Sequence, residues 1–327
     1  MTMMKKRHIL HWAMGVILTP LLGSCATDDV VGGAGREECD IILGQPMTVT
    51  SVTRSTDGRT SSTQFDSGET VWLWANKTDG TEYIKAWQLT AQGEGSFIGT
   101  VKYWPSDGSS LNVYALHGNF ENSQITEDAT SWSSLTLLTH TVETNQTKDE
   151  NKRLSDLLYS HPTTSFAPNN TVQLTFDHEL SKICIVLQKH SDSGIQEDDL
   201  KKATVQVSDI YPEVKYNTST RVVTPSGTPT AITLGQETSG STTYEAIVPS
   251  GMTVAPHVTI TLKDFPASGN TRTFSCQLGN VTFAKGNKYT FTLTLHNEIV
   301  VSSSMISPWI DDEATNVEIP QATVESS

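Results

Sequence analysis

Short runs in which apolar and polar residues alternate are the feature that most constrains the fold of this chain. In the clearest run, Lys288–Leu295, the residues Tyr289, Phe291, Leu293 and Leu295 alternate with threonines or a lysine. A period of two residues is typical of a β-strand, whose side chains point alternately to opposite faces. Similar runs, rich in β-branched and aromatic residues, are Met47–Thr53, Thr70–Ala75, Ser110–Ala115, Ser134–Leu138, Val172–Phe176, Lys182–Leu187, Ala203–Ile210, Tyr244–Val248, Val258–Leu262 and Thr271–Leu278.

Turn residues separate these runs, and helix signals are rare. Asp57-Gly58, Asp79-Gly80 and Asp107-Gly108 fall between predicted strands, and an Asp-Gly pair tolerates the positive φ angles of a tight hairpin. Only Ile195–Lys202 has a helical pattern, which extends over one or two turns. Many short strands with little helix predict an all-β fold built from β-sandwiches.

The strand pattern is interrupted between Lys148 and Asn170 by a charged run and a proline-containing loop. We therefore predict an N-terminal β-sandwich over residues 47–160 and a C-terminal β-sandwich over residues 161–327. A chain of about 300 residues is long enough for two domains, each with its own core. Residues 25–46 are rich in glycine and aspartate, and we predict that they form a tether.

Residues 1–24 have the layout of a bacterial lipoprotein signal peptide. A basic stretch, Lys5–Arg7, precedes an apolar run from Ile9 to Leu22, and Leu22-Gly23-Ser24-Cys25 resembles a lipobox. The apolar run is shorter than the about 20 residues of a transmembrane helix. We predict that Cys25 is lipidated and becomes the first residue of the mature chain. An ordinary signal peptide that is cut nearby is the alternative.

The chain is acidic, with a formal net charge of −14. Residues 1–24 contain three basic and no acidic residues, so their removal changes the charge from −14 to −17. Binding of nucleic acid or of anionic lipid requires clustered lysine and arginine. We therefore predict no nucleic-acid partner and interpret the charge as an aid to solubility outside the cell.

The sequence contains no recognisable catalytic, cofactor or metal motif. The nucleophile elbow, the zinc-binding helix, the phosphate loop and the dinucleotide fingerprint are all missing. His178 lies between Asp177 and Glu179, a setting compatible with acid–base chemistry. No nucleophile or metal partner accompanies it, so we expect a hydrogen-bonded packing residue at the end of a strand. We predict that the protein is not an enzyme and has no cofactor.

Trp72 and Trp74 lie two residues apart, on one face of a predicted strand. Such a pair can form an aromatic platform that stacks on sugar rings. The alternative, which we favour, is that both indoles fill the core. Cys184 and Cys276 also lie in predicted strands, where we expect packed thiols. A disulfide bridge between them stays open, since connectivity cannot be deduced from spacing.

A set of short motifs runs in order along nearly the whole chain: Val52–Ser55, Phe65–Glu69, Tyr103–Pro105, Leu111–Ala115, Asp156–Ser160, Val172–Ile183, Ile247–Pro249, Phe283–Tyr289 and Ile306–Trp309. Together they resemble the fimbrillin family of Bacteroidetes, which contains the subunits of type V pili and related surface lipoproteins. The resemblance implies two tandem transthyretin-like β-sandwich domains, a lipoprotein precursor and assembly by donor-strand exchange. Ser55 departs from the family pattern, because many relatives have alanine there.

In this family an arginine-specific protease removes the first strand, and the resemblance implies the same for this chain. Met47–Thr53 is the predicted first strand. Arg54 follows it in a polar segment of the kind that proteases reach, so Arg54 is the candidate cleavage site. Arg36 and Arg59 are competing sites, and an ordinary surface arginine is the alternative for Arg54.

Loss of a strand would leave an open groove that a strand of another subunit can fill. Such an added strand binds through main-chain hydrogen bonds, and its alternate side chains fill pockets in the groove. The donor strand is predicted to come from Ile299–Ile310, which we favour, or from Val317–Val324.

These observations together predict a structural or adhesive subunit of a type V-like fimbria, lipid-anchored to the outer membrane as a precursor and exposed at the cell surface or in the fimbrium. Its expected partners are other fimbrial subunits, the outer membrane through the lipid anchor, and a ligand on a host or bacterial surface. A glycan-binding surface lipoprotein of a nutrient-uptake system is the alternative. Solvent exposure of Trp72 or Trp74 would favour that alternative.

Overall fold

The computed structural model describes residues 46–52, 65–121, 123–162, 165–296, 299–309 and 317–318. These residues form an all-β fold with short helical turns, which confirms the predicted fold class. The helical elements are η1 (Trp132–Ser134), α1 (Asp149–Ser155) and α2 (Glu197–Lys201). Among the described residues, no helix has the length and apolar composition needed to cross a membrane.

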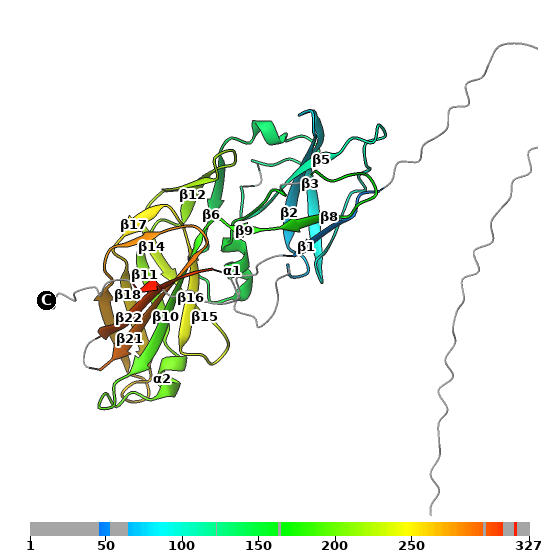
Figure 1. The fold of residues 1–327 in the computed structure, drawn as a ribbon. Helices are drawn as coiled ribbons and strands as arrows, with labels where there is room; N and C mark the ends of the chain where they lie inside the picture. Colours follow the sequence, from blue (N-terminus) through cyan, green and yellow to red (C-terminus); the bar gives the residue numbers. More distant parts are fainter. Residues whose placement is uncertain are drawn as a thin grey trace, which may run out of the picture. The chain divides into compact units, whose positions relative to one another are not determined.

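The N-terminal sheet contains eight strands among the described residues, in the order β8-β1-β4-β3-β2-β5-β7-β9. Its strands are β1 (Val49–Val52), β2 (Thr70–Lys77), β3 (Glu82–Gly93), β4 (Ser96–Gly99), β5 (Leu111–His117), β7 (Leu158–Ser160), β8 (Val172–Thr175) and β9 (Asp177–His178). In Figure 1, β1 lies beside β8, the strand with which it pairs.

The two ends of this sheet meet. β8 and β9 are separated only by Phe176, yet they stand at opposite ends of the strand order. The sheet must therefore curl until both ends reach the segment 172–178. Phe176 at the junction is fully buried. The backbone thus joins the two ends of the sheet, and the edges that β8 and β9 leave are short, which limits the aggregation hazard of unpaired strands.

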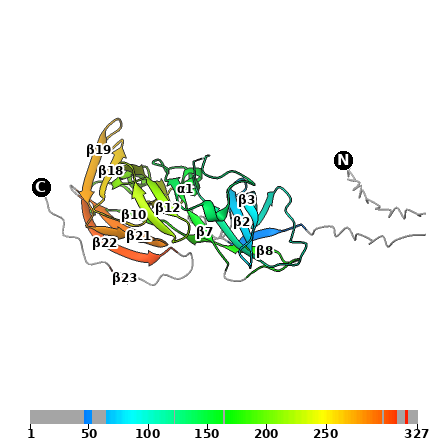
Figure 2. The same cartoon turned by 90° about the horizontal axis from the view of Figure 1, so that it is seen from above.

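The C-terminal part consists of several sheets, of which the largest has the order β15-β16-β10-β21-β22-β23. Its strands are β15 (Gly235–Gln236), β16 (Thr243–Val248), β10 (Ser181–Lys189), β21 (Asn287–Leu295), β22 (Ile299–Pro308) and β23 (Val317–Glu318). Figure 2 shows β21, β22 and β23 side by side, as their pairing requires.

A second sheet has the order β14-β11-β18-β19, and two smaller ones have the orders β13-β12-β6 and β17-β20. The strands are β14 (Thr230–Thr233), β11 (Thr204–Ile210), β18 (His257–Lys263), β19 (Thr271–Gln277), β13 (Val222–Ser226), β12 (Glu213–Asn217), β6 (Leu138–Thr141), β17 (Met252–Val254) and β20 (Val281–Phe283). The apolar faces of the two larger sheets contribute to one core cluster, which includes Ile185, Phe291 and Ile260.

The structure agrees with most of the predicted strands and corrects some of them. The alternation in 288–295 is confirmed, because Tyr289, Phe291, Leu293 and Leu295 are all buried. The prediction of a strand over Ser134–Leu138 was wrong for most of its length: η1 ends at residue 134, and β6 begins only at residue 138. The helical pattern of 195–202 corresponds to α2.

Hydrogen bonds cross the boundary that we predict after residue 160. Strands β8 and β9 complete the N-terminal sheet, while β6 pairs with β12. The boundary itself stays a prediction.

A buried histidine lies in the small sheet that contains β6. His140 is fully buried, its Nδ1 accepts a hydrogen bond from the backbone N–H of Asn119 (3.0 Å), and its Nε2 donates to the carbonyl of Ser155 (3.0 Å). The ring is therefore neutral, with its proton on Nε2. A Cβ at Gly118 would lie 2.8 Å from Phe120 Cζ and 3.0 Å from His140 Nδ1, so a larger residue there would have to displace these rings.

We predict that His140 makes the fold sensitive to acid. Burial lowers the pKa of His140 from 6.5 to about 4. Between pH 6.5 and pH 4 the imidazole of the unfolded chain binds a proton, whereas the buried imidazole of the folded chain stays neutral. The contribution of His140 to the free energy of unfolding is therefore fully present above pH 6.5 and is lost as the pH falls, by about 3 kcal/mol at pH 4. Urea unfolding at pH 7 and at pH 4 measures the difference in the free energy of unfolding between the two pH values. This difference should be smaller in His140→Gln than in the unchanged chain. The exposed His190→Gln is the control, and an unchanged difference between the two pH values in His140→Gln would contradict the assignment.

Candidate functional site

β1 is the strand through which the N-terminal sheet closes. It pairs in parallel with β8 from Val49↔Val172 to Val52↔Thr175, and it pairs antiparallel with β4 at Thr50↔Ser96. Two more backbone hydrogen bonds hold the residues before β1. Met47 N donates to Lys102 O (2.8 Å), and Thr48 O accepts from Val172 N (2.9 Å). The part of the predicted first strand that the structure describes is therefore paired within the N-terminal sheet, as expected.

Alternate side chains of this segment enter the core. Met47 and Val49 are 7% and 3% exposed, whereas Thr48 between them faces solvent. Both apolar side chains belong to the cluster that also contains Val172 and Phe176. Removal of the strand would thus leave a groove between β4 and β8 that has backbone hydrogen-bonding groups on both sides and apolar pockets at its base.

The chain after the polar segment is held independently of β1. Phe65 is buried, and its ring packs edge-on against Phe97 and Phe176, with centroids 5.5 and 5.1 Å apart. The next residue, Asp66, forms an ion pair with Arg153 of α1 at 2.9 Å. The described chain resumes at Phe65, so a cut between Val52 and Phe65 would leave these anchors in place.

The C-terminal strand β22 is firmly built into its own sheet. It pairs with β21 from Leu295↔Ile299 to Asn287↔Pro308. At its end Trp309 is 4% exposed, and its backbone N–H donates to Gly286 O (2.6 Å). The Trp309 ring stacks on His178, with centroids 4.0 Å apart, and His178 Nδ1 lies 3.2 Å from Asp156 Oδ2.

The following strand β23 is held much less extensively. Among the described residues it pairs with β22 only at Met305↔Glu318 and Ile306↔Val317. Release of β23 therefore breaks the pairing at these two positions, whereas release of β22 breaks its pairing with β21 along its whole length.

The predicted site residues differ in where the structure places them. Cys25 and Arg54 lie outside the described residues. Trp74 is fully buried, its Nε1–H donates to Thr130 O (2.9 Å), and its ring packs against Trp132 at 5.3 Å. Trp72 is partly buried against the same cluster. Trp74 cannot offer a face to a sugar ring, which corrects the aromatic platform and agrees with the packing alternative.

The remaining candidates are buried packing residues. His178 is 5% exposed at the end of β9, as expected. Cys184 and Cys276 are both free and buried, so the bridge that the sequence left open is absent. Burial raises the pKa of Cys184 to about 12 and that of Cys276 to about 11, which makes both thiols unreactive near neutral pH. Among the described residues, no cluster of His, Cys, Asp and Glu is arranged for a metal ion.

Two contacts of the site could not be found from the sequence. Arg153 lies in a charged run that we interpreted as part of the domain boundary, yet it anchors Asp66 and, at 3.6 Å, Glu69. Trp309 stands at the end of a family motif, but no local pattern indicates that it stacks on a residue more than a hundred positions earlier.

The described residues define an all-β protein in which β1, the first strand among them, completes a curled sheet. The sequence model of the fimbrillin-like family matches residues 53–309, and the chain belongs to this family. A comparison with curated protein sequences finds no match.

Solved structures show the same fold. A protein from Bacteroides uniformis, described as a candidate cell adhesion protein, is 19% identical with a TM-score of 0.57, over 81% of this chain and 98% of its own. A second protein of the same description, from Bacteroides ovatus, is 14% identical with a TM-score of 0.61, over 83% of this chain and 99% of its own. At these identities the likeness concerns the fold alone.

We predict that the Val49 side chain stabilises the closed sheet. Val49→Ala removes buried methyl groups and leaves a cavity, so the free energy of unfolding should fall by about 2 kcal/mol. Thr48→Ala, one residue earlier on the solvent side, should change it by less than about 0.5 kcal/mol. Urea unfolding of both variants measures the difference. Equal effects of the two substitutions would mean that β1 is not inserted as described.

Proposed function

We propose that this chain is a structural or adhesive subunit of a type V-like fimbria, anchored to the outer membrane as a lipoprotein precursor and assembled by donor-strand exchange. The observation that carries this proposal is the position of β1, between β4 and β8 at the closure of the N-terminal sheet. A strand that is near the N-terminus, short and paired on both sides can be replaced by an equivalent strand in trans. Membership of the fimbrillin-like family supports the same function.

Cleavage after Arg54 would separate β1 from the rest of the sheet. Without β1, several backbone donors and acceptors of β4 and β8 lose their partners, and each costs about 1 to 3 kcal/mol if it stays buried. A neighbouring subunit restores these bonds by inserting a strand parallel to β8. The buried Phe65 and the Asp66–Arg153 ion pair would hold the new N-terminal region in place during the exchange.

We propose that the donor is the segment after Trp309, with Val317–Val324 at its centre, rather than Ile299–Ile310. Extraction of β22 would break its pairing with β21 along its whole length and expose Trp309. Release of β23 costs the two register pairs that it forms with Met305 and Ile306. This difference supports the tail over the segment that we favour from the sequence alone.

Cleavage of the purified precursor with an arginine-specific protease should therefore produce assembly. We expect ladders on a denaturing gel run without boiling, because each inserted strand restores the closed sheet of its neighbour. Arg54→Ala should give no ladder, whereas Arg36→Ala and Arg59→Ala should give the same ladder as the unchanged chain. If the cleaved unchanged chain stays monomeric, the protein does not polymerise by this route.

A truncated chain that ends at Trp309 separates the two donors. It should be cleaved normally yet form no ladder, since it lacks the proposed donor but keeps β22. A ladder from this variant would identify β22 as the donor instead.

The anchor makes a separate prediction. In bacterial cells, Cys25→Ala should abolish acylation and release the protein from the membrane fraction, since two or more acyl chains provide the stable attachment. Mass spectrometry of the N-terminal peptide, with Cys184→Ala as the control, reports the modification directly. Membrane retention of Cys25→Ala with an unmodified N-terminus would contradict lipid anchoring.

A further inference from the structure

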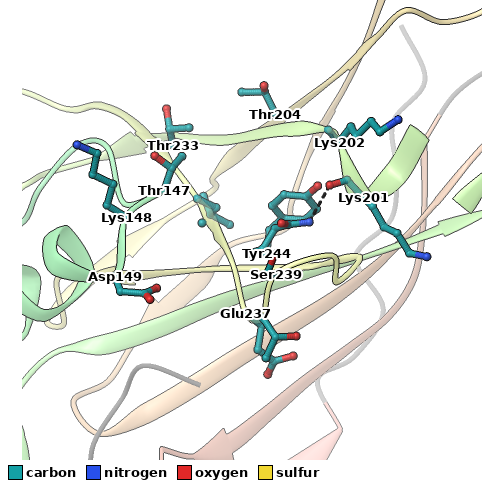
Figure 3. A pocket seen from close by; sticks show the side chains of 15 residues that line it. Thr147, Lys148, Asp149, Lys201, Lys202, Thr204, Thr233, Glu237, Ser239 and Tyr244 are labelled. Atoms are coloured by element: carbon teal, nitrogen blue, oxygen red, sulfur yellow. Dashed lines mark hydrogen bonds between the residues drawn. The ribbon is translucent and has the colours of Figure 1, made fainter. Parts of the chain in front are cut away.

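A cavity of about 990 Å³ lies between the start of α1, the end of α2 and the turn after β15 (Figure 3). Its rim comes from three stretches, 147–149, 201–204 and 235–239, while Thr233, Leu234 and Tyr244 contribute further lining. The volume is at the upper end of the range of about 300 to 1,000 Å³ that is typical of ligand sites. The cavity does not involve β1 or β22.

The walls of the cavity are fixed by internal hydrogen bonds. Gln236 Nε2 donates to the carbonyls of Lys201 and Ser241, both at 2.7 Å, and Tyr244 OH donates to Leu200 O (2.6 Å). The buried Lys152 donates to Gln236 O (2.8 Å). A side chain at Gly235 would come within 2.3 Å of a backbone oxygen, so the wall is packed tightly there. A pre-formed site of this kind loses little entropy when a ligand binds.

The charges around the cavity are not balanced. Each lining carboxylate has a lysine nearby: Glu237 lies 3.5 Å from Lys288, and Asp149 lies 3.8 Å from Lys152. By contrast, Lys148 and Lys202 are exposed and form no ion pair with any residue that the structure describes.

In a chain of net charge −14, two uncompensated ammonium groups at one cavity favour a negatively charged ligand. Figure 3 shows Lys148 and Lys202 on opposite sides of this site.

Hydroxyl groups line the space between these two lysines. Thr147, Thr204 and Thr233 lie there, and Ser239 lies below them (Figure 3). Two of these hydroxyls already form one hydrogen bond each: Thr147 Oγ1 donates to Asn145 Oδ1 (2.7 Å), and Thr233 Oγ1 accepts from Gln206 Nε2 (3.1 Å). Thr147 can still accept and Thr233 can still donate, so they match a ligand that is itself rich in hydroxyls. Tyr244 is buried and offers no stacking face, so hydrogen bonds and charge would provide the recognition.

The main chain of the sheet edge at this cavity is already paired at Thr233. β14 is the edge strand there, but Thr233 N already donates to Thr144 O (2.8 Å), and Thr233 O accepts from Gln146 N (2.9 Å). An extended peptide therefore cannot pair with the main chain of Thr233.

We infer that this cavity binds an acidic oligosaccharide, one that bears uronate carboxylates or sulfate groups. Lys148 and Lys202 pair with the acidic groups, and the threonine hydroxyls bind the sugar hydroxyls between them. The site goes beyond the proposed assembly function and does not depend on it, because its walls contain neither β1 nor the C-terminal strands.

The test is calorimetric titration of the purified full chain with oligogalacturonate, a chondroitin sulfate oligosaccharide, a neutral cello-oligosaccharide and a glutamate oligopeptide. We expect binding of at least one acidic glycan and weaker binding of the neutral glycan and the peptide. The double variant Lys148→Ala/Lys202→Ala should weaken acidic-glycan binding by about tenfold or more, since each lost charge-assisted contact contributes to affinity. Thr204→Val, which keeps the charge, should also weaken it.

The matched control is Lys189→Ala/Lys263→Ala, which makes the same change in net charge at two exposed lysines outside the cavity. It should bind as the unchanged chain does, and thermal unfolding of all variants establishes that they are folded. Equal weakening in both double variants would mean non-specific charge attraction and would overturn the inference. So would tighter binding of the peptide, or no binding of either acidic glycan by the unchanged chain.

Discussion

The N-terminal half of this protein depends on the pairing of one short strand with β4 and β8. Because the segment 172–178 forms both ends of the strand order, β1 is needed to join β8 to the rest of the sheet. A closed sheet protects its backbone from water and from other chains. Under the proposed function, one cut in the segment after β1 would convert a stable precursor into a chain that requires a partner.

Two buried aromatic residues mark the limits of the central body of the subunit. Phe65 is buried just after the polar segment, and Trp309 is buried at the end of β22. Trp309 and His178 pack closely, although Trp309 Nε1 and His178 Nε2 lack hydrogen-bond partners among the described residues. The exchangeable parts lie outside these two buried residues, so the central body of the subunit can stay intact while its strands are replaced.

Much of the fold could be predicted from the sequence, because a period of two residues is a local signal. The burial of Tyr289 and Phe291 and the inward side chains of Met47 and Val49 follow from it. Contacts between distant residues leave no such signal: nothing in the pattern indicates that Arg153 pairs with Asp66 or that Trp74 is covered by Trp132. For the same reason the groups that line the cavity, which come from separate loops, could not be brought together before the structure was known.

Helix α1 links the assembly region to the cavity. Arg153 forms an ion pair with Asp66, which lies just after the polar segment. Its neighbour Lys152 donates to Gln236 O in the cavity wall and forms an ion pair with Glu245 of the C-terminal sheet. The side chains of adjacent helix residues point about 100° apart, so Lys152 and Arg153 contact two different parts of the protein from one turn of α1. None of the lining hydrogen bonds involves β1, β4 or β8. If both proposals hold, loss of β1 would open the groove between β4 and β8 and leave the cavity formed, so that a subunit would bind its ligand both before and after it joins a neighbour.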